Sequence, residues 1–208
     1  MENLGKFYID GKWVTPNSKQ AMSVINPALE EEIGTVILGN NNDVDLAVKA
    51  ANLAFDSFSQ TTKEERLKLL KRIHEVTSDR FEELAQAMST EMGAPITMSR
   101  EAQADSGLGH LQGFIEALEK LEEETTLSNG DILAKEPIGV CGLITPWNWP
   151  INQITLKVLP AIACGCTCIL KPSEHTPVSA MLYAEILHEA GVPPGVFNLI
   201  HGTGEEVG

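Results

Sequence analysis

The stretch that decides the fold is VCGLITPWNWP, residues 140–150. Its first half, Val140 to Ile144, is a short continuous apolar run, which is typical of a strand buried on both faces. Its second half combines two tryptophans, two prolines and one asparagine in a stiff turn, and a helix is expected after Pro150. We predict a ligand site at this turn, because open α/β sheets bind ligands at the carboxyl ends of their strands. A rigid loop whose tryptophans serve only in packing explains the composition equally well.

The chain downstream of residue 150 alternates strands with helices. Apolar runs at 167–170 and 196–200 predict two further buried strands, and residues 177–190 show the pattern of a helix between them. Such alternation indicates parallel βαβ units. Only residues 202–208 follow the last strand, so we expect its apolar surface to lack a covering helix and the sequence to be part of a larger domain.

The chain upstream of residue 138 is predicted to form a hairpin, several helices and one more strand. In chain order, the patterns predict a hairpin over 7–14 that turns at Asp10-Gly11, an amphipathic helix over 43–59, a helix that starts at the Thr62–Glu65 capping box, a helix from about Ser78 to Gly93, a long helix over 97–122, and a strand with one solvent-exposed face over 132–137. The helices are the layers that a parallel sheet needs on its faces.

The composition is that of an acidic globular protein. The 208 residues carry 29 acidic and 15 basic side chains, a formal net charge of −14, and 43% of them are hydrophobic. Such a surface repels nucleic acid and anionic membranes, so we expect neither as a partner. The first residues do not resemble a signal peptide, and no apolar run is long enough to span a membrane. We expect a cytoplasmic protein whose four cysteines are free thiols.

A charged loop, KPSEHTP, follows the second of the predicted parallel strands at 171–177. Lys171 offers a donor and Glu174 an acceptor, a pair that suits the two hydroxyls of a ribose. The competing interpretation is an ordinary charged loop in which Ser173 or Thr176 caps the next helix.

A glycine-containing loop, GTGEEVG, follows the third predicted parallel strand at 202–208. Its glycines would let the backbone approach a diphosphate, and the amides of a following helix would favour an anion. The signal is weak, because three residues separate the last two glycines where the usual dinucleotide fingerprint has two. Glu205 and Glu206 would also oppose a phosphate placed directly on this turn.

The cysteines and histidines show no pattern of a metal site. Cys164, Cys166 and Cys168 are two apart and would share one face of a strand, but no histidine lies in register and the segment is apolar. We interpret these cysteines as small buried apolar residues, and Cys141 as an inert residue within a strand. We expect surface or capping roles for the histidines, which are His74, His110, His175, His188 and His201.

Three segments, residues 136–150, 171–177 and 191–198, together strongly resemble the aldehyde dehydrogenase superfamily. The resemblance extends over nearly the whole chain, from Ile9 to Gly208. It implies an α/β fold with a Rossmann-like parallel sheet and flanking helices, which is an incomplete aldehyde dehydrogenase fold.

The resemblance also implies how the chain is organised. Residues 1–118 and 138–208 match the NAD-binding domain, which is incomplete at its C-terminus, and residues 119–137 match the strand segment used in subunit association. The catalytic domain of the family is absent from this sequence. Family members form homodimers and homotetramers, so the resemblance implies one of these assemblies for the full-length protein.

Members of this family oxidise aldehydes to carboxylic acids with NAD or NADP. A cysteine thiolate attacks the aldehyde, hydride leaves for the nicotinamide, and a glutamate-activated water hydrolyses the thioester. Asn148 resembles the oxyanion-hole asparagine, whose amide stabilises charge on the aldehyde oxygen. The cofactor-binding residues implied by the resemblance are Ile144, Thr145, Pro146 and Trp147 along the cofactor, Lys171, Ser173 and Glu174 around the adenosine ribose, and Gly204 and Gly208 near the adenine and diphosphate.

Glu174 also bears on the choice of cofactor. A carboxylate beside the 2′-hydroxyl would repel a 2′-phosphate, so we expect NAD to be preferred over NADP. Lys171 would soften that repulsion, which leaves NADP as the alternative cofactor.

Two motifs that carry the family's chemistry do not occur in these 208 residues. One is a Glu-Leu-Gly-Gly-like motif with the general-base glutamate, and the other is a Gly-Gln-x-Cys-like motif with the nucleophile. We therefore expect the chain to be the N-terminal, cofactor-binding part of an NAD-dependent aldehyde dehydrogenase and to be inactive alone. The competing hypothesis is a non-catalytic nucleotide-binding or assembly module that associates with full-length subunits.

Overall fold

The computed structural model of the chain describes residues 3–208, and its central element is a five-stranded mixed sheet. Its strands are β1 Phe7–Ile9, β2 Lys12–Val14, β7 Val140–Ile144, β8 Thr167–Lys171 and β9 Phe197–Leu199, in the spatial order β2-β1-β9-β8-β7. Strands β7, β8 and β9 run parallel, which confirms the predicted βαβ units. Strand β1 pairs antiparallel with both β9 and β2, so the predicted N-terminal hairpin extends the same sheet.

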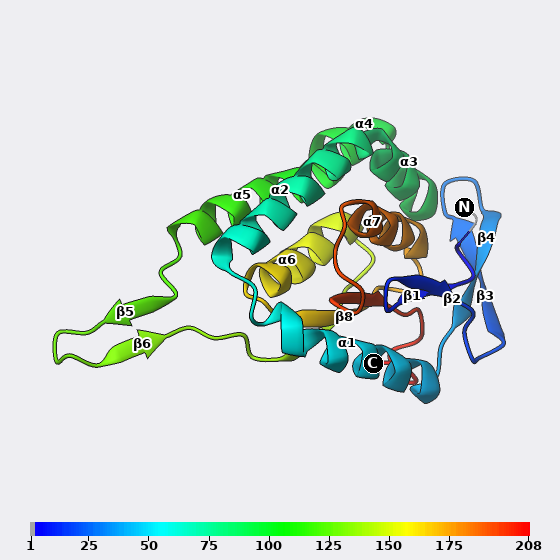
Figure 1. The fold of residues 1–208 in the computed structure, drawn as a ribbon. Helices are drawn as coiled ribbons and strands as arrows, with labels where there is room; N and C mark the ends of the chain where they lie inside the picture. Colours follow the sequence, from blue (N-terminus) through cyan, green and yellow to red (C-terminus); the bar gives the residue numbers. More distant parts are fainter. Residues whose placement is uncertain (1–2) are drawn as a thin grey trace.

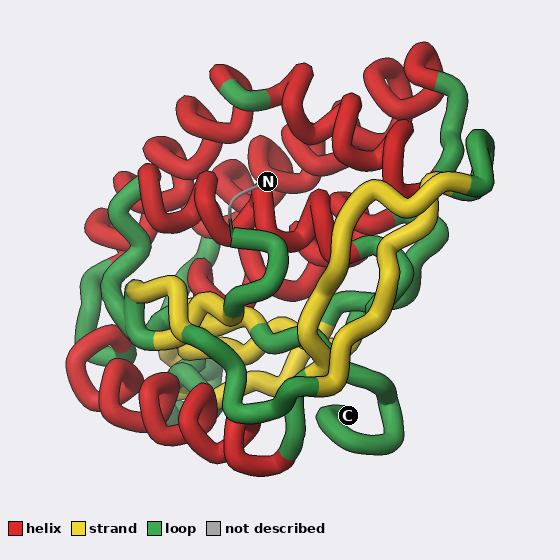
Figure 2. Tube along the Cα trace, turned by 90° about the vertical axis from the view of Figure 1, so that its right-hand side faces the viewer, coloured by secondary structure: helices red, strands yellow, loops and turns green. Residues whose placement is uncertain are grey.

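Helices cover both faces of this sheet and form a further layer on one side (Figure 1). Helix α1 (Asn41–Phe58) packs on one face, while α6 (Pro150–Ala163) and α7 (Pro177–Glu189) pack on the other. The outer layer, which contacts α6 and α7, consists of α2 Lys63–Asp79, α3 Phe81–Met92 and α5 Asp105–Lys120. Seen from the side, the sheet lies between α1 and the stacked helices (Figure 2). None of the described helices is long and apolar enough to cross a membrane.

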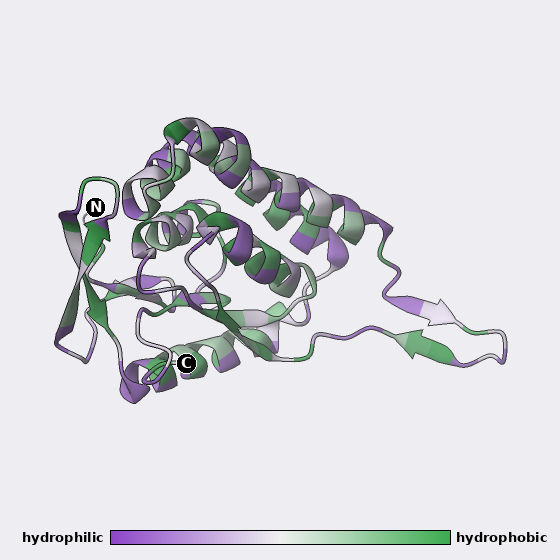
Figure 3. Ribbon diagram, turned by 180° about the vertical axis from the view of Figure 1, so that it is seen from behind, coloured by the Kyte–Doolittle hydropathy of each residue, from purple (hydrophilic) through white to green (hydrophobic). Residues whose placement is uncertain are grey.

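Two antiparallel ribbons lie outside the central sheet. The first, β3 (Gln20–Asn26) with β4 (Glu31–Leu38), packs beside α3. The second, β5 (Glu124–Thr126) with β6 (Ile132–Ala134), is an arm that extends away from the body, and its strand β6 is hydrophobic (Figures 1 and 3). All three residues of β6 are exposed, so the prediction of a longer strand with one buried face is wrong. Because the arm extends away from the rest of the described chain, neither face of β6 is buried.

Local signals in the sequence set most helix boundaries. The capping box before α2 is present: the Glu65 amide donates to Thr62 Oγ1 at 3.2 Å, and the Thr62 amide donates to Glu65 Oε2 at 2.8 Å. Gly93 ends α3 with a φ of 71°, in the left-handed region where glycine is favoured over residues with a Cβ. Helix α2 continues to Asp79 and α3 begins at Phe81, so the predicted helix start near Ser78 comes three residues early.

The predicted long helix over 97–122 is in fact three segments. They are α4 Ile96–Met98, a π-helical segment η1 Ser99–Ala104, and α5 Asp105–Lys120. The π-helical segment is only 6 residues long, which is too short for periodicity to distinguish it from the α-helical turns around it. The wide turn places Ser99 and Gln103 in the interior.

Two predictions about strand burial are wrong, and both follow from the order of the strands. Strand β7 was expected to be buried on both faces, but it is an edge strand whose residues are half-buried or exposed. Strand β9 was expected to lack cover, but it is fully buried, because β1 pairs with its free edge and α1 and α7 cover its faces. The uncovered apolar surface therefore lies at β7, where Ile138 and Ile144 are exposed.

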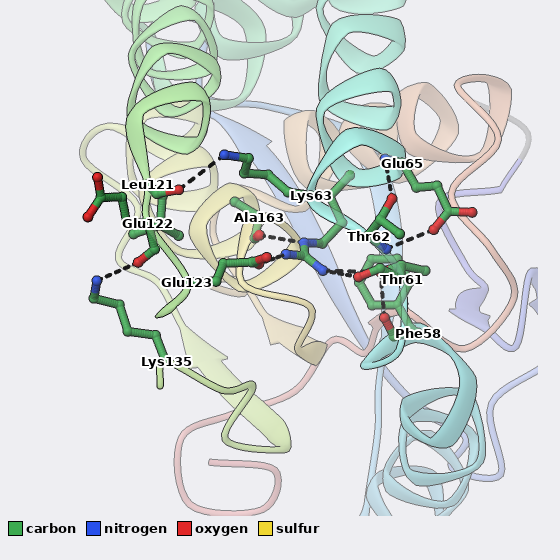
Figure 4. A network of polar contacts seen from close by, with 11 residues as sticks. Phe58, Thr61, Thr62, Lys63, Glu65, Leu121, Glu122, Glu123, Lys135 and Ala163 are labelled. Carbon is green, nitrogen blue, oxygen red and sulfur yellow. Dashed lines mark hydrogen bonds and ion pairs between the residues drawn. The ribbon is translucent and has the colours of Figure 1, made fainter. Parts of the chain in front are cut away.

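A buried arginine joins the base of the arm to the helices (Figure 4). Arg66 donates to the carbonyl oxygens of Ala163, at 2.9 Å, and Thr61, and it also pairs with the carboxylate of Glu123, directly before β5. Figure 4 labels these three partners. Only 4% of Arg66 is exposed. Lys63 adds a bond of 3.2 Å to the carbonyl oxygen of Leu121. These contacts fix the point at which the arm leaves the body.

Arg66→Met is expected to lower the free energy of unfolding by roughly 2–3 kcal/mol, because buried carbonyl oxygens lose a charged donor. Chemical denaturation of the two chains measures this difference. The matched control is Lys71→Met, which also removes a cation from α2 but breaks the Lys71–Glu119 pair on the exposed surface. Exposed pairs add little stability, so equal losses in the two variants would contradict the role given to Arg66.

Candidate functional site

The three loops singled out in the sequence meet at one edge of the sheet. Ile144 and Lys171 are register partners at the ends of β7 and β8, and the Thr145 amide donates to the carbonyl oxygen of Lys171 at 3.2 Å. The Ile200 amide donates to the carbonyl oxygen of Leu170 at 3.0 Å, which brings the end of β9 alongside. The carboxyl edge of the parallel strands thus gathers residues 144–150, 171–177 and 200–208.

The turn after β7 presents its central residues to solvent. Thr145 is buried, whereas Pro146, Trp147 and Asn148 are exposed, and 55% of the surface of Trp147 is accessible. Trp147 is exposed among the described residues, so its indole does not pack in their core. The amide of Asn148 is accessible to a ligand at this edge.

The predicted pair in the second loop is formed. Lys171 Nζ donates to Glu174 Oε2 at 3.1 Å and to the carbonyl oxygen of Pro172 at 3.2 Å, and 7% of Lys171 is exposed. Burial tends to raise the pKa of Glu174, but a backbone amide and the Lys171 ammonium outweigh it and hold that pKa below its usual value. Glu174 is therefore a carboxylate at neutral pH, which accepts hydrogen bonds and opposes other anions.

The competing interpretation, that Ser173 or Thr176 caps the next helix, is wrong. Thr176 occupies the N-cap position of α7 without a side-chain hydrogen bond to the helix, and Ser173 Oγ accepts from the His175 amide at 3.3 Å. The cap comes from Glu91, at the end of α3, whose carboxylate accepts from the Val178 amide at 2.6 Å and the Ser179 amide at 3.1 Å.

Sequence reasoning missed Glu91 altogether. It lies 87 residues before the amides that it caps, so no local motif signals the contact. The residue is 3% exposed. Burial raises the pKa of Glu91 to about 7, and hydrogen bonds from Ser179 and Val178 limit that rise. A glutamate on the apolar face of a predicted helix was the one available signal.

The glycine-containing loop forms a compact turn without a helix. The Val207 amide donates to the carbonyl oxygen of Thr203 at 3.1 Å, and a Cβ added at Gly202 would overlap the Val207 side chain. A Cβ at Gly208 would lie 2.7 Å from the carbonyl oxygen of Gly204, whereas one at Gly204 would meet nothing within 4 Å. Gly202 and Gly208 are thus needed for the turn itself, and the backbone at Gly204 is open to a ligand.

His201 is a correction to the sequence analysis. It was expected on the surface or at a cap, but it is fully buried between the end of β9 and the glycine turn, and neither ring nitrogen has a hydrogen-bond partner. Burial, together with the positive charge of Lys171, lowers the pKa of His201 to about 3. The imidazole is therefore neutral under physiological conditions.

The cysteines lie away from this edge. Cys141 and Cys168 are register partners, three residues before Ile144 and Lys171, and burial raises the pKa of each thiol. Cys166 and Cys168 are buried as predicted, but Cys164 is exposed at the end of α6, so its predicted burial is wrong. Of these three cysteines only Cys168 lies in a strand, so they share no strand face. The described residues contain no group of three or more His, Cys, Asp or Glu side chains that could hold a metal.

The chain is similar to known proteins in both sequence and structure. A model of the aldehyde dehydrogenase family matches residues 13–208. The 3-succinoylsemialdehyde-pyridine dehydrogenase of a Pseudomonas species is 49% identical over the whole chain, which covers 44% of that protein. The chain thus spans less than half of the length of this curated relative.

Solved structures agree in fold. An aldehyde dehydrogenase from Bartonella henselae is 47% identical with a TM-score of 0.96, over 98% of this chain and 43% of its own. Aldehyde dehydrogenase C of Pseudomonas syringae, solved as a mutant with NAD+ and octanal, is 50% identical with a TM-score of 0.97, over 99% of this chain and 42% of its own. Betaine aldehyde dehydrogenase of Staphylococcus aureus, solved with NAD+, is 35% identical with a TM-score of 0.92, over 97% of this chain and 41% of its own.

Proposed function

Because this chain belongs to the aldehyde dehydrogenase family, we propose that it is the cofactor-binding part of an enzyme that oxidises an aldehyde to a carboxylic acid with NAD. The observation that carries the proposal is the convergence of the Trp147 turn, the Lys171–Glu174 pair and the open Gly204 backbone at one sheet edge. The NAD+ complexes of the two relatives named above support this choice of cofactor.

The donor set at the edge fits a dinucleotide. Lys171, Ser173 and Glu174 would hold the hydroxyls of the adenosine ribose, and Gly204 and Gly208 would lie near the adenine and diphosphate. The backbone of Ile144, Thr145, Pro146 and Trp147 would run along the cofactor. When bound, NAD supplies the hydride acceptor. Asn148 donates its amide hydrogens to the aldehyde oxygen and stabilises the charge that develops there.

Residues 1–118 and 138–208 form the cofactor domain in this proposal, and residues 119–137 form the segment for subunit association. The arm is suited to pairing with another subunit, because it stands away from the body and exposes Leu127, Ile132 and Leu133. Apolar side chains gathered on an isolated ribbon favour a protein partner. The partner proposed here is a second subunit of the same enzyme, in a homodimer or homotetramer.

NAD titration of the 208-residue chain, followed by calorimetry, tests the proposed site. We expect saturable binding that is tighter for NAD than for NADP, because the Glu174 carboxylate repels a 2′-phosphate. Glu174→Gln should weaken NAD binding by roughly tenfold or more, the usual effect of losing a hydrogen bond to a charged group. Glu174→Gln should also reduce the difference in affinity between NAD and NADP.

The matched control for Glu174→Gln is Glu189→Gln, at the other end of α7. It removes the same charge from the chain and should leave both affinities unchanged. If NAD bound with equal affinity to all three chains, the ribose site would lie elsewhere.

A further inference from the structure

Helix α7 begins without a cap of its own. Thr176 at the N-cap makes no side-chain bond to the helix, and Pro177 in the first turn has no amide hydrogen to donate. The first free amides of the helix are therefore those of Val178 and Ser179, and both donate to Glu91. The start of α7 thus depends on a side chain from another element.

Glu91 is held firmly where it makes this contact. It is 3% exposed at the end of α3, a helix that packs along α7. The end of α3 is itself fixed, because Gly93 turns the chain in the left-handed region. Gly93 also packs closely on Pro27, since a Cβ added at Gly93 would lie 2.9 Å from Pro27 Cγ. None of the ion pairs among the described residues includes Glu91. The amides and the dipole of α7 are what face its carboxylate.

The loop between β8 and α7 has two anchors. Lys171 fixes one end within the sheet, and the first turn of α7 fixes the other. Between the anchors, the His175 amide donates to Ser173 Oγ and the Thr176 amide donates to the carbonyl oxygen of Ser173. Lys171 Nζ adds bonds to Glu174 and to the carbonyl oxygen of Pro172. The position of α7 therefore acts together with the direct bond from Lys171 to set where Glu174 lies.

We propose that Glu91 is a positioning residue for the cofactor site: by capping α7 it holds the 171–177 loop so that Glu174 and Lys171 together meet the adenosine ribose. This inference rests on the proposed function for the identity of the ligand. It goes beyond that function by giving a residue on α3, outside the sheet edge, control over the affinity for the adenosine half of the cofactor.

The test compares Glu91→Gln with the same kind of substitution at a second buried carboxylate that also caps a helix. Asp43 is 2% exposed, accepts from the Asn40 and Asn17 amides and helps to cap α1, on the opposite face of the sheet. Asp43→Asn is therefore the matched control. Val178→Pro is the second test variant, since it removes one donor to Glu91 in the first turn of a helix, where proline is tolerated.

Two readouts on the 208-residue chain are needed. Amide hydrogen exchange should rise at least tenfold in residues 171–179 of Glu91→Gln, and the same segment should loosen in Val178→Pro, while Asp43→Asn leaves it unchanged. NAD titration should show a five- to tenfold weaker affinity for both test variants. In the Glu174→Gln background, Glu91→Gln should cause no further loss, because it acts through Glu174.

Three results would overturn the proposal: unchanged exchange in residues 171–179, unchanged NAD affinity in both test variants, or losses for Glu91→Gln and Glu174→Gln that multiply in the double variant. If the parent chain shows no saturable NAD binding, the proposed function fails, and with it the ligand named here. Exchange then still decides whether Glu91 fixes the loop. If one of the two test variants, Glu91→Gln or Val178→Pro, no longer unfolds cooperatively, the other test variant is used in its place.

Discussion

The 208-residue chain, purified and supplied with NAD and an aldehyde, is expected to form no NADH above the enzyme-free blank. Aldehyde oxidation in this family needs a thiolate beside the nicotinamide. The nucleophilic form of cysteine is the thiolate, and burial raises the pKa of Cys141, Cys164 and Cys168, which favours the protonated thiol instead. The sequence contains four cysteines, and the remaining one, Cys166, is buried.

The position of the thiols leads to the same result. Cys141 and Cys168 are three residues before the carboxyl edge of the sheet. A strand rises by about 3.3 Å per residue, so these sulfur atoms are roughly 10 Å from the loops that would hold the cofactor. Attack on an aldehyde held at Asn148 needs a nucleophile within about 3.5 Å. Cys141 and Cys168 therefore meet neither the chemical nor the geometric requirement.

Absorbance at 340 nm measures this prediction, with a full-length relative as the positive control for the aldehyde and NAD. The sharpest control is Cys164→Ser, since Cys164 is the exposed thiol and the first that an aldehyde would meet. NADH formation by the parent chain that disappears in Cys164→Ser would contradict the prediction and would assign a catalytic role to this thiol.

The parts of the fold that depend on neighbouring residues could be predicted from the sequence. The Asp10-Gly11 hairpin, the Thr62–Glu65 capping box and the parallel strands each have a local signal, and each is confirmed. The convergence of three loops at one edge also follows, because parallel strands end at the same side of a sheet. The cofactor roles of these loops stay predictions until NAD binding is measured.

The features that escaped prediction are set by contacts between distant segments. The burial of β9 depends on β1, which comes almost 190 residues earlier in the chain, as in the bond of the Asp10 amide to Asn198 Oδ1 across 188 positions. The cap of α7 by Glu91 spans 87 positions. His201 follows an apolar strand and its ring nitrogens have no hydrogen-bond partner, and its burial depends on how the strands assemble into the sheet. Periodicity and local motifs carry no information about such pairs.

His201 and Glu91 are expected to give the stability of the chain opposite dependences on pH. The pKa of His201 is lowered by burial from 6.5 to about 3, so the unfolded chain binds the extra proton and stability is lost as pH falls below 6.5. The pKa of Glu91 is raised by burial from 4.5 to about 7, so the folded chain binds the extra proton and stability is lost as pH rises through 7.

The two contributions nearly cancel between pH 7 and pH 5. Over this interval the linkage relation gives a loss of roughly 2 kcal/mol from His201 and a gain of roughly 2 kcal/mol from Glu91. Relative to the parent chain, His201→Leu should therefore gain stability by about 2 kcal/mol on acidification, and Glu91→Gln should lose about the same amount. The sign of each change, rather than the stability of either variant at one pH, is the informative quantity.

Urea denaturation of the parent and the variants at pH 7, 6 and 5 measures these slopes. The double variant is the internal control, because removing both groups should restore the parent's dependence on pH. Exposed carboxylates such as Glu82 titrate alike in every chain and drop out of the differences. Parallel curves for the parent and both single variants would show that neither group has the same environment in solution as in the fold described above. If the dependence of stability on pH changed in His201→Leu alone, the buried imidazole would be confirmed, but Glu91 would have to be in contact with water. Glu91 would then lack the burial on which its control of the 171–177 loop depends.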